Sequence, residues 1–168
     1  MTADDDLQPA VAREYLALAD SLASATDAAW DLRSLCEAWR VREVIAHVTV
    51  PARYDQETFT AELRARDFDF GRLSNEIAAR DAQLATDELV ANLREDTLLH
   101  WVPPDGGYRG ALNHVVIHGL EVTVPMGLQR RPPDATMRAV LVDRTEAAST
   151  AALARSSPGG DSREPVSR

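Results

Sequence analysis

The 168-residue sequence contains no lysine, so its 18 basic residues are all arginines. Schiff-base catalysis and the phosphate-binding P-loop both require a lysine, and its absence excludes both. The only cysteine is Cys36, which excludes a disulfide within the chain. Its apolar neighbours favour a packing role over a reactive thiol. Any metal site must therefore rest on histidine and carboxylate ligands.

Long apolar runs are also missing, and no stretch approaches the length that spans a membrane. Residues 1–6 lack the basic and apolar regions of a signal peptide. We therefore expect a cytoplasmic protein without a membrane partner. With 27 acidic residues the net charge is -9, and we expect no nucleic-acid partner because phosphate backbones would be repelled.

Several catalytic motifs are absent as well. The sequence has no Gly-x-Ser-x-Gly elbow for a serine nucleophile and no Gly-x-Gly-x-x-Gly loop for a dinucleotide. It also lacks the His-Glu-x-x-His motif of metalloproteases, because Val115 follows the histidine at position 114. Hydride transfer, phosphate chemistry and peptide hydrolysis thus have no support in the sequence.

Apolar residues recur at helical intervals along most of the chain, and no alternating strand pattern occurs. The clearest stripe predicts a first helix and consists of Val11, Tyr15, Leu18 and Leu22. The almost wholly apolar segment 109–126 predicts a central helix, although its Val-Val-Ile run would also suit a buried strand. We predict an all-α four-helix bundle with short additional helices, comprising residues 1–155, followed by a disordered polar tail over 156–168.

Further elements are expected around this core. Helices should begin near Trp39, near Leu73 and at the capping residue Thr86, which should open one helix carrying Leu89, Leu93 and Leu98. Pro51 should kink or end the helix that starts near Trp39, and residues 67–71 should form a turn. A last helix should follow Pro133 and turn its apolar residues inward, namely Met137, Val140, Leu141 and Ala148.

Within the central helix, His114 and His118 stand four residues apart and so share one face. Two imidazoles at this spacing can bind one metal ion at about 2.0–2.1 Å. Buried imidazoles without partners would cost about 1–3 kcal/mol each, so a shared face calls for a common explanation. Metal ligation is one explanation, and hydrogen bonds to neighbouring helices are the other.

His47, near the end of the second predicted helix, is a candidate third ligand. Three imidazoles would leave at least one coordination position open, as in catalytic metal sites. Glu121 shares the face of the pair and could be a fourth ligand, but we favour a role as acceptor for the second ring nitrogen of His118. His100, beside the proline-rich loop, is interpreted as a surface residue.

Two segments resemble the mycothiol-dependent maleylpyruvate isomerase family, whose metal-binding domain belongs to the DinB/YfiT-like superfamily. The first runs from Trp30 to Val48 and contains Trp-Arg-Val-Arg-Glu-Val-Ile-Ala-His, and the second is His114-Val-Val-Ile-His-Gly-Leu-Glu121. Residues 68–80 also resemble the middle region of that family. The resemblance spans roughly residues 7–142 and implies a helical bundle that holds a divalent metal through three side chains.

Residue by residue, the resemblance assigns His47 as the first ligand, His118 as the last and His114 as the position four before it. The isomerase itself is expected to have a glutamate at that position, whereas three histidines are common in the broader DinB-like group. The isomerase also has a C-terminal domain that supplies an essential arginine, and this sequence ends in a polar tail where that domain would start. The resemblance therefore favours metal binding over maleylpyruvate isomerisation itself.

The resemblance implies an enzyme that activates a small thiol, mycothiol, on a divalent metal for S-transfer to an electrophile or for cis–trans isomerisation. Zinc is the favoured metal, and nickel and iron are compatible with the same ligands. Arg80 and Arg53 are candidates for holding an anionic substrate, with solvated surface arginines as the alternative interpretation. The competing functional hypothesis is a non-catalytic metal-binding bundle that acts as a dimerising or regulatory module, and a homodimer is compatible with either.

Overall fold

The computed structural model describes residues 7–104 and 106–156, and this part of the chain forms helices and loops without a strand. In chain order the helices are α1 (Gln8–Leu22), α2 (Asp27–Trp30), α3 (Val41–Val48), α4 (Val50–Arg53), α5 (Gln56–Arg64), α6 (Phe70–Asp81), α7 (Thr86–Asn92), α8 (Asp96–Leu99), α9 (Gly107–Thr123) and α10 (Asp134–Ser156). The predicted all-α class is confirmed. The predicted tail lies outside the described residues apart from Ser156, which ends α10.

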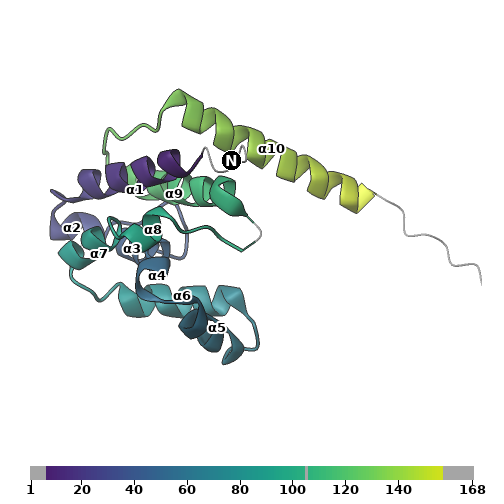
Figure 1. Ribbon diagram of the computed structural model, residues 1–168. Helices are drawn as coiled ribbons and strands as arrows, with labels where there is room; N and C mark the ends of the chain where they lie inside the picture. The colour runs from purple at the N-terminus through teal and green to yellow at the C-terminus, as the bar shows by residue number, and fades with distance from the viewer. Residues whose placement is uncertain (1–6, 105, 157–168) are drawn as a thin grey trace, which may run out of the picture.

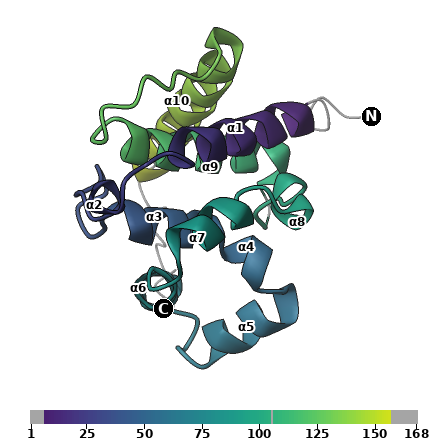
Figure 2. The same cartoon turned by 90° about the vertical axis from the view of Figure 1, so that its left-hand side faces the viewer.

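The bundle is built around α9, which contacts α1, α3 and α10, while α3 also packs against α6. Figures 1 and 2 show α1, α9 and α10 together at one end of the molecule, α3 in the middle and α5 with α6 at the other end. The predicted four-helix bundle with short additional helices is thus confirmed, with α1, α3, α6 and α9 as its main helices. The central position of α9 explains why its residues are apolar on nearly every side.

The core follows the stripes that the sequence displays. Val11, Tyr15, Leu18 and Leu22 of α1 are buried, as predicted. At the start of α3 the Glu43 carboxylate accepts a hydrogen bond from the backbone N–H of Arg40, which satisfies an N–H group that the helix leaves unpaired. This cap fixes where α3 begins, and His47 consequently lies in its last turn.

Three local predictions are wrong. Thr86 is the first residue of α7 rather than its cap, a position that Ala85 takes. The single helix expected to carry Leu89 and Leu98 is divided into α7 and α8. The predicted break near Pro51 is present: α3 ends at Val48, Pro51 stands in the first turn of α4, where its missing N–H costs nothing, and α4 ends at Arg53.

The third wrong prediction concerns Leu141, which is 56% exposed although Val140 beside it is buried, and Ala148 is exposed as well. A shift of one residue turns a helical side chain by about 100°, so only one of the two neighbours can face α9. The predicted turn at 67–71 is present only in part. Asp67 and Phe68 have positive φ angles and end the turn, whereas Phe70 already belongs to α6.

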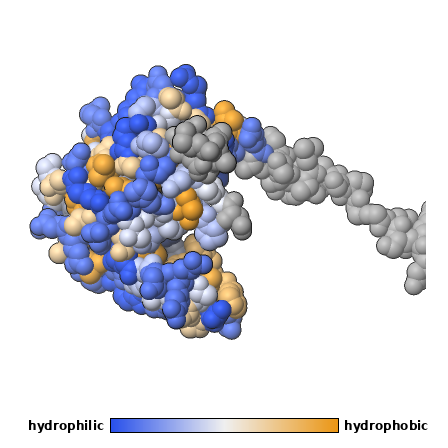
Figure 3. Space-filling view, viewed as in Figure 1, coloured by the Kyte–Doolittle hydropathy of each residue, from blue (hydrophilic) through white to orange (hydrophobic). Residues whose placement is uncertain are grey.

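The surface in Figure 3 is mostly hydrophilic, with an apolar patch at the lower right, over the turn between α5 and α6. Phe68 and Phe70 are 65% and 57% exposed there. Helix α5 was not predicted from the sequence, and it begins where the Asp55 carboxylate accepts a hydrogen bond from the backbone N–H of Thr58. None of the described helices is long and apolar enough to cross a membrane.

Candidate metal centre

Three histidines from two helices meet between α3 and α9. His47 comes from the last turn of α3, and His114 and His118 come from successive turns of α9. One potential ligand atom from each residue lies within 4.8 Å of the others. The ring centroids are 4.8 Å apart for His114 and His118, and 5.3 Å and 5.1 Å from these two to His47. The structure therefore brings together the three residues that the sequence singled out.

The Nδ1 atom of each ring has its own hydrogen-bond partner outside the cluster. His47 Nδ1 lies 3.0 Å from Ser74 Oγ, on α6. His118 Nδ1 lies 2.7 Å from a carboxylate oxygen of Glu121, on α9. His114 Nδ1 lies 3.5 Å from the hydroxyl of Tyr15, on α1. Because Nδ1 is engaged in every ring, Nε2 is the atom that each histidine has left to offer.

The spacing of the Nε2 atoms of His47 and His114 fits a metal ion. His47 Nε2 and His114 Nε2 are 3.4 Å apart. Two nitrogens bound to zinc at about 2.0–2.1 Å, with a tetrahedral angle between them, are separated by about 3.3–3.4 Å. Partners on the second nitrogen of each ligand are also the usual surroundings of a metal-binding histidine, because they fix ring orientation and tautomer. The donor set suits a divalent ion that accepts imidazole.

Electrostatics keep the rings in the form that can bind a cation. Burial, and secondarily the proximity of His118, lowers the pKa of His47 to about 4. Burial likewise lowers the pKa of His114, and its two histidine neighbours lower it further. Both rings are consequently neutral at pH 7, with a free lone pair on the nitrogen that is not protonated. Burial also raises the pKa of Tyr15, whose hydroxyl stays protonated beside His114.

Two tryptophans stand against the cluster. The Trp39 ring lies 4.9 Å from His47, and its Nε1 donates a hydrogen bond to Asn75 of α6. The Trp101 ring lies 5.3 Å from His114. Each of the three histidines nonetheless retains partial exposure to solvent. The cluster has three members among the described residues, whereas a closed structural metal site would normally have four protein ligands.

The other predicted site residues lie as follows. Glu121 is in the position favoured for it, as acceptor from His118. His100 ends α8 with 55% of its side chain exposed and takes no part in the cluster. The Arg80 guanidinium binds Asp81, Glu62 and the Tyr54 hydroxyl, so its donors are engaged within the chain.

Arg53 is not a solvated surface arginine, which was the alternative to a substrate-binding role. Its side chain is only 13% exposed and pairs with Asp81 at 3.0 Å. It also donates to the backbone oxygens of Ala46 and Thr49, at the end of α3. Because Ala46 directly precedes His47, Arg53 holds the segment of backbone that carries the first histidine of the cluster.

Sequence reasoning missed Tyr15 and Ser74. Tyr15 carried a signal, since it is the one residue with a polar group in the apolar stripe of α1, and a buried hydroxyl requires a partner. Ser74 carried none, because it lies on the predominantly polar α6 beside the buried Leu73. Its contact with His47 spans 27 residues of sequence and depends on how α6 packs against α3.

The chain matches one known protein family over about half of its length. Residues 11–98 match the family model described as the mycothiol maleylpyruvate isomerase N-terminal domain, and these 88 positions are just over half of the 168. The match includes His47 and its partner Ser74, and it ends before His114. Neither the curated proteins nor the solved structures gave a match. The matched family, the resemblance of the two histidine segments and the helical bundle agree: the chain belongs to the mycothiol maleylpyruvate isomerase N-terminal domain family, which is DinB-like.

Proposed function

We propose that His47, His114 and His118 hold a divalent metal ion, with zinc favoured over nickel and iron, and that the protein uses it to activate a low-molecular-weight thiol. The thiol is mycothiol, and the reaction is S-transfer to an electrophile or thiol-assisted isomerisation of one. The observation that carries the proposal is that one potential ligand atom of each histidine lies within 4.8 Å of the others, while the Nδ1 atom of each ring already has a hydrogen-bond partner. The family to which the chain belongs is named for mycothiol and an isomerase.

A divalent cation held by neutral imidazoles keeps its positive charge and lowers the pKa of a coordinating thiol, which supplies a thiolate at neutral pH. The chain's own residues prepare this position. Burial keeps His47 and His114 neutral, so that their nitrogens are available as ligands. Glu121 holds the proton of His118 on Nδ1 and so directs Nε2 toward the cluster.

The partial exposure of the three rings supports a site that a substrate can enter. Trp39 forms a wall beside His47 with its indole fixed by Asn75, so a thiol that reaches the cluster would pass an aromatic surface. With three protein ligands, at least one coordination position remains for the sulfur. These features favour an enzyme over the non-catalytic module, which has no need for an accessible ligand position.

The first experiment measures metal content of the purified protein by mass spectrometry. We expect about one equivalent in the wild type and less than a tenth in His47→Ala. His100→Ala is the matched control, because it removes an exposed histidine outside the cluster and should leave metal content unchanged. If the wild type carries no stoichiometric metal after incubation with zinc, both the enzyme and the metal-binding module are excluded.

The second experiment separates these two functions. Cobalt-substituted protein is titrated with mycothiol, and its absorption spectrum is recorded. Coordination of sulfur should add a charge-transfer band in the near ultraviolet and change the visible bands. A spectrum that stays unchanged at millimolar thiol would exclude the thiol-dependent enzyme, and the metal-binding module would then be the remaining function.

A further inference from the structure

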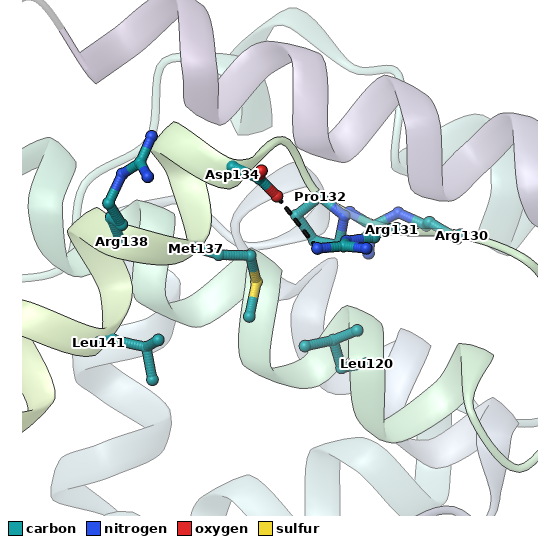
Figure 4. Close-up of a pocket in the computed structure, with 8 residues that line it drawn as sticks. All are labelled: Leu120, Arg130, Arg131, Pro132, Asp134, Met137, Arg138 and Leu141. Carbon is teal, nitrogen blue, oxygen red and sulfur yellow. Dashed lines mark hydrogen bonds and ion pairs between the residues drawn. The ribbon is translucent and has the colours of Figure 1, made fainter.

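A cleft lies on the side of α9 that faces away from the histidines, between α9, the segment that leads to α10, and α10 itself. Leu120 of α9 lines this cleft. It follows His118 by two residues, and successive helical side chains differ by about 100°, so the two side chains point in nearly opposite directions. The cleft has a volume of about 430 Å³, within the range that small organic ligands occupy. Figure 4 shows the side chains that surround it, with arginines at two ends and apolar residues between them.

Arg130 lines this cleft and is almost fully buried, with 5% of its side chain exposed. Its Nη2 donates to the Oε2 of Glu14, at 2.7 Å, and to the backbone oxygen of the same residue. Its Nε and Nη1 have no hydrogen-bond partner among the described residues. Unpaired buried donors on a cation are costly, so this guanidinium has unused capacity to bind an acceptor.

The position of Arg130 depends on a glycine. A Cβ atom at Gly119 would lie 2.8 Å from Nη1 of Arg130, closer than real Cβ contacts permit. Glycine is thus what allows the guanidinium to lie against α9. The absence of a side chain there leaves the arginine at the inner side of the cleft, held by Glu14 from α1.

Two more arginines line the same cleft. Arg131 pairs with Asp134 at 3.2 Å, as the dashed line in Figure 4 shows, and both side chains are largely exposed. Arg138 is exposed and has no ion pair with any described residue. Glu14 balances the charge of Arg130 and Asp134 balances that of Arg131, so Arg138 leaves this cleft with one net positive charge in a chain whose net charge is -9. This charge favours an anionic occupant.

The walls between the arginines are apolar and are formed by Leu120, Met137 and Leu141. Leu141 is 56% exposed, and a ligand in the cleft would cover this apolar surface. Met137 is flexible and adapts to ligands of different shape. We propose that this cleft binds a small organic carboxylate with an apolar body, whose carboxylate pairs with Arg138 at one end while its body lies on Leu120 and Met137, toward the buried Arg130 at the other end (Figure 4).

The proposal is tested by isothermal titration calorimetry of the full chain with 3-phenylpropanoate, using the neutral 3-phenylpropanamide as the matched ligand. We expect the carboxylate to bind saturably and at least tenfold more tightly than the amide, with affinity falling as chloride is added. Arg138→Gln should weaken carboxylate binding at least fivefold. The variant should fold normally, because Arg138 is exposed and makes no ion pair with the described residues.

Arg144→Gln provides the control, since it makes the same change on an exposed position of the same helix outside the cleft. Binding to this variant should stay within twofold of the wild type. Equal affinity for carboxylate and amide, equal effects of the two variants, or no saturable binding would each overturn the proposal. So would a second copy as occupant, which sedimentation velocity would reveal as a dimer that Arg138→Gln dissociates. None of these outcomes depends on metal binding at the histidines.

Discussion

The buried polar groups on the two sides of α9 differ in charge and in how their hydrogen-bonding atoms are used. On one side, three imidazoles meet, and each uses Nδ1 for a partner outside the cluster and keeps Nε2 for the centre. On the other side, one buried guanidinium meets one carboxylate, and two of its nitrogens remain without a partner among the described residues. The first arrangement directs its unused atoms to one point, whereas the second holds a charge whose donors are only partly used.

The difference lies in where the cost of burial falls. Neutral imidazoles lose little by leaving water, because burial has already shifted their pKa values away from the charged form. Arg130 cannot become neutral in this way, since a guanidinium stays protonated in proteins. The arginine side therefore depends on a specific counter-charge, Glu14, and the histidine side depends on geometry. Four predictions test this contrast, beginning with the largest expected effect.

Removing the counter-charge should have the largest consequence. Glu14→Ala leaves the Arg130 charge buried and unpaired, which should lower the free energy of unfolding by about 3–5 kcal/mol. Asp20→Ala is the control on the same helix, α1. It breaks the exposed ion pair between Asp20 and Arg94 and should lower the free energy of unfolding by about 0–1 kcal/mol. Urea unfolding followed by circular dichroism measures both. Equal losses would show that the buried pair is no more important than a surface pair.

The second prediction concerns acid and the metal-free protein. His47 has a folded-state pKa of about 4 against about 6.5 when unfolded, so only the unfolded chain takes up its proton between these values. Stability should therefore be complete above about pH 6.5 and should fall as the pH drops toward 4. The expected loss is up to about 3 kcal/mol, with His114 acting in the same direction.

This effect is measured from urea midpoints between pH 7.5 and 5 in the presence of a chelator. Most carboxylates titrate below this window, so the slope within it reports on the histidines. His47→Gln should flatten the slope. A stability that is constant from pH 7.5 to 5 in the wild type would contradict the assignment of neutral, buried rings.

The third prediction sharpens the histidine side of the comparison. Glu121→Gln keeps an acceptor for His118 Nδ1 but removes its charge, and we expect metal affinity to fall by about 10-fold to 100-fold. Competition with a chromophoric chelator measures the affinity. Glu88→Gln makes the same change on an exposed residue of α7 and should have no effect. If the two variants bind metal equally, the Glu121 contact has no part in orienting the ligand.

The smallest effect is expected at Ser74. Ser74→Ala removes the hydrogen bond to His47 Nδ1, and metal affinity should fall by less than about 10-fold because water can replace a partly exposed hydroxyl. Ser21→Ala on α1 is a matched control, since its hydroxyl bonds only to the backbone oxygen of Ala17. A loss as large as that of Glu121→Gln would show that a neutral partner orients its histidine as strongly as a charged one.

The sequence was sufficient to propose the three histidines because the information for them is local, whereas the contacts of Tyr15 and Ser74 depend on how other helices pack. The interval between His114 and His118 places both residues on one face of α9, and the apolar residues on nearly every side of that helix indicate that this face is buried. His47 could be proposed from its place at the end of an apolar stripe and from a family resemblance. None of this required knowing which helices are neighbours.

The arginine side was missed because its contacts are distant in sequence. Glu14 and Arg130 are separated by 116 residues, and only the packing of α1 and α10 on α9 brings them together. Leu141 was expected inside for a related reason. Periodicity alone predicts an apolar face but cannot fix its angle to within one residue. The capping residue of α7 was misassigned because Thr86 and Ala85 differ by a single position, which lies within the normal uncertainty of a helix end.

The arrangement of tryptophans gives the protein an intrinsic optical reporter. Two of its three indoles lie against histidine rings of the cluster, Trp39 at 4.9 Å and Trp101 at 5.3 Å, and the third, Trp30, is buried in the core. A paramagnetic ion such as cobalt or copper at the cluster would quench the emission of the first two and leave the third. Unfolding would expose all three and shift their emission to longer wavelength. Occupancy of the cluster and integrity of the fold can thus be followed in a single unlabelled sample.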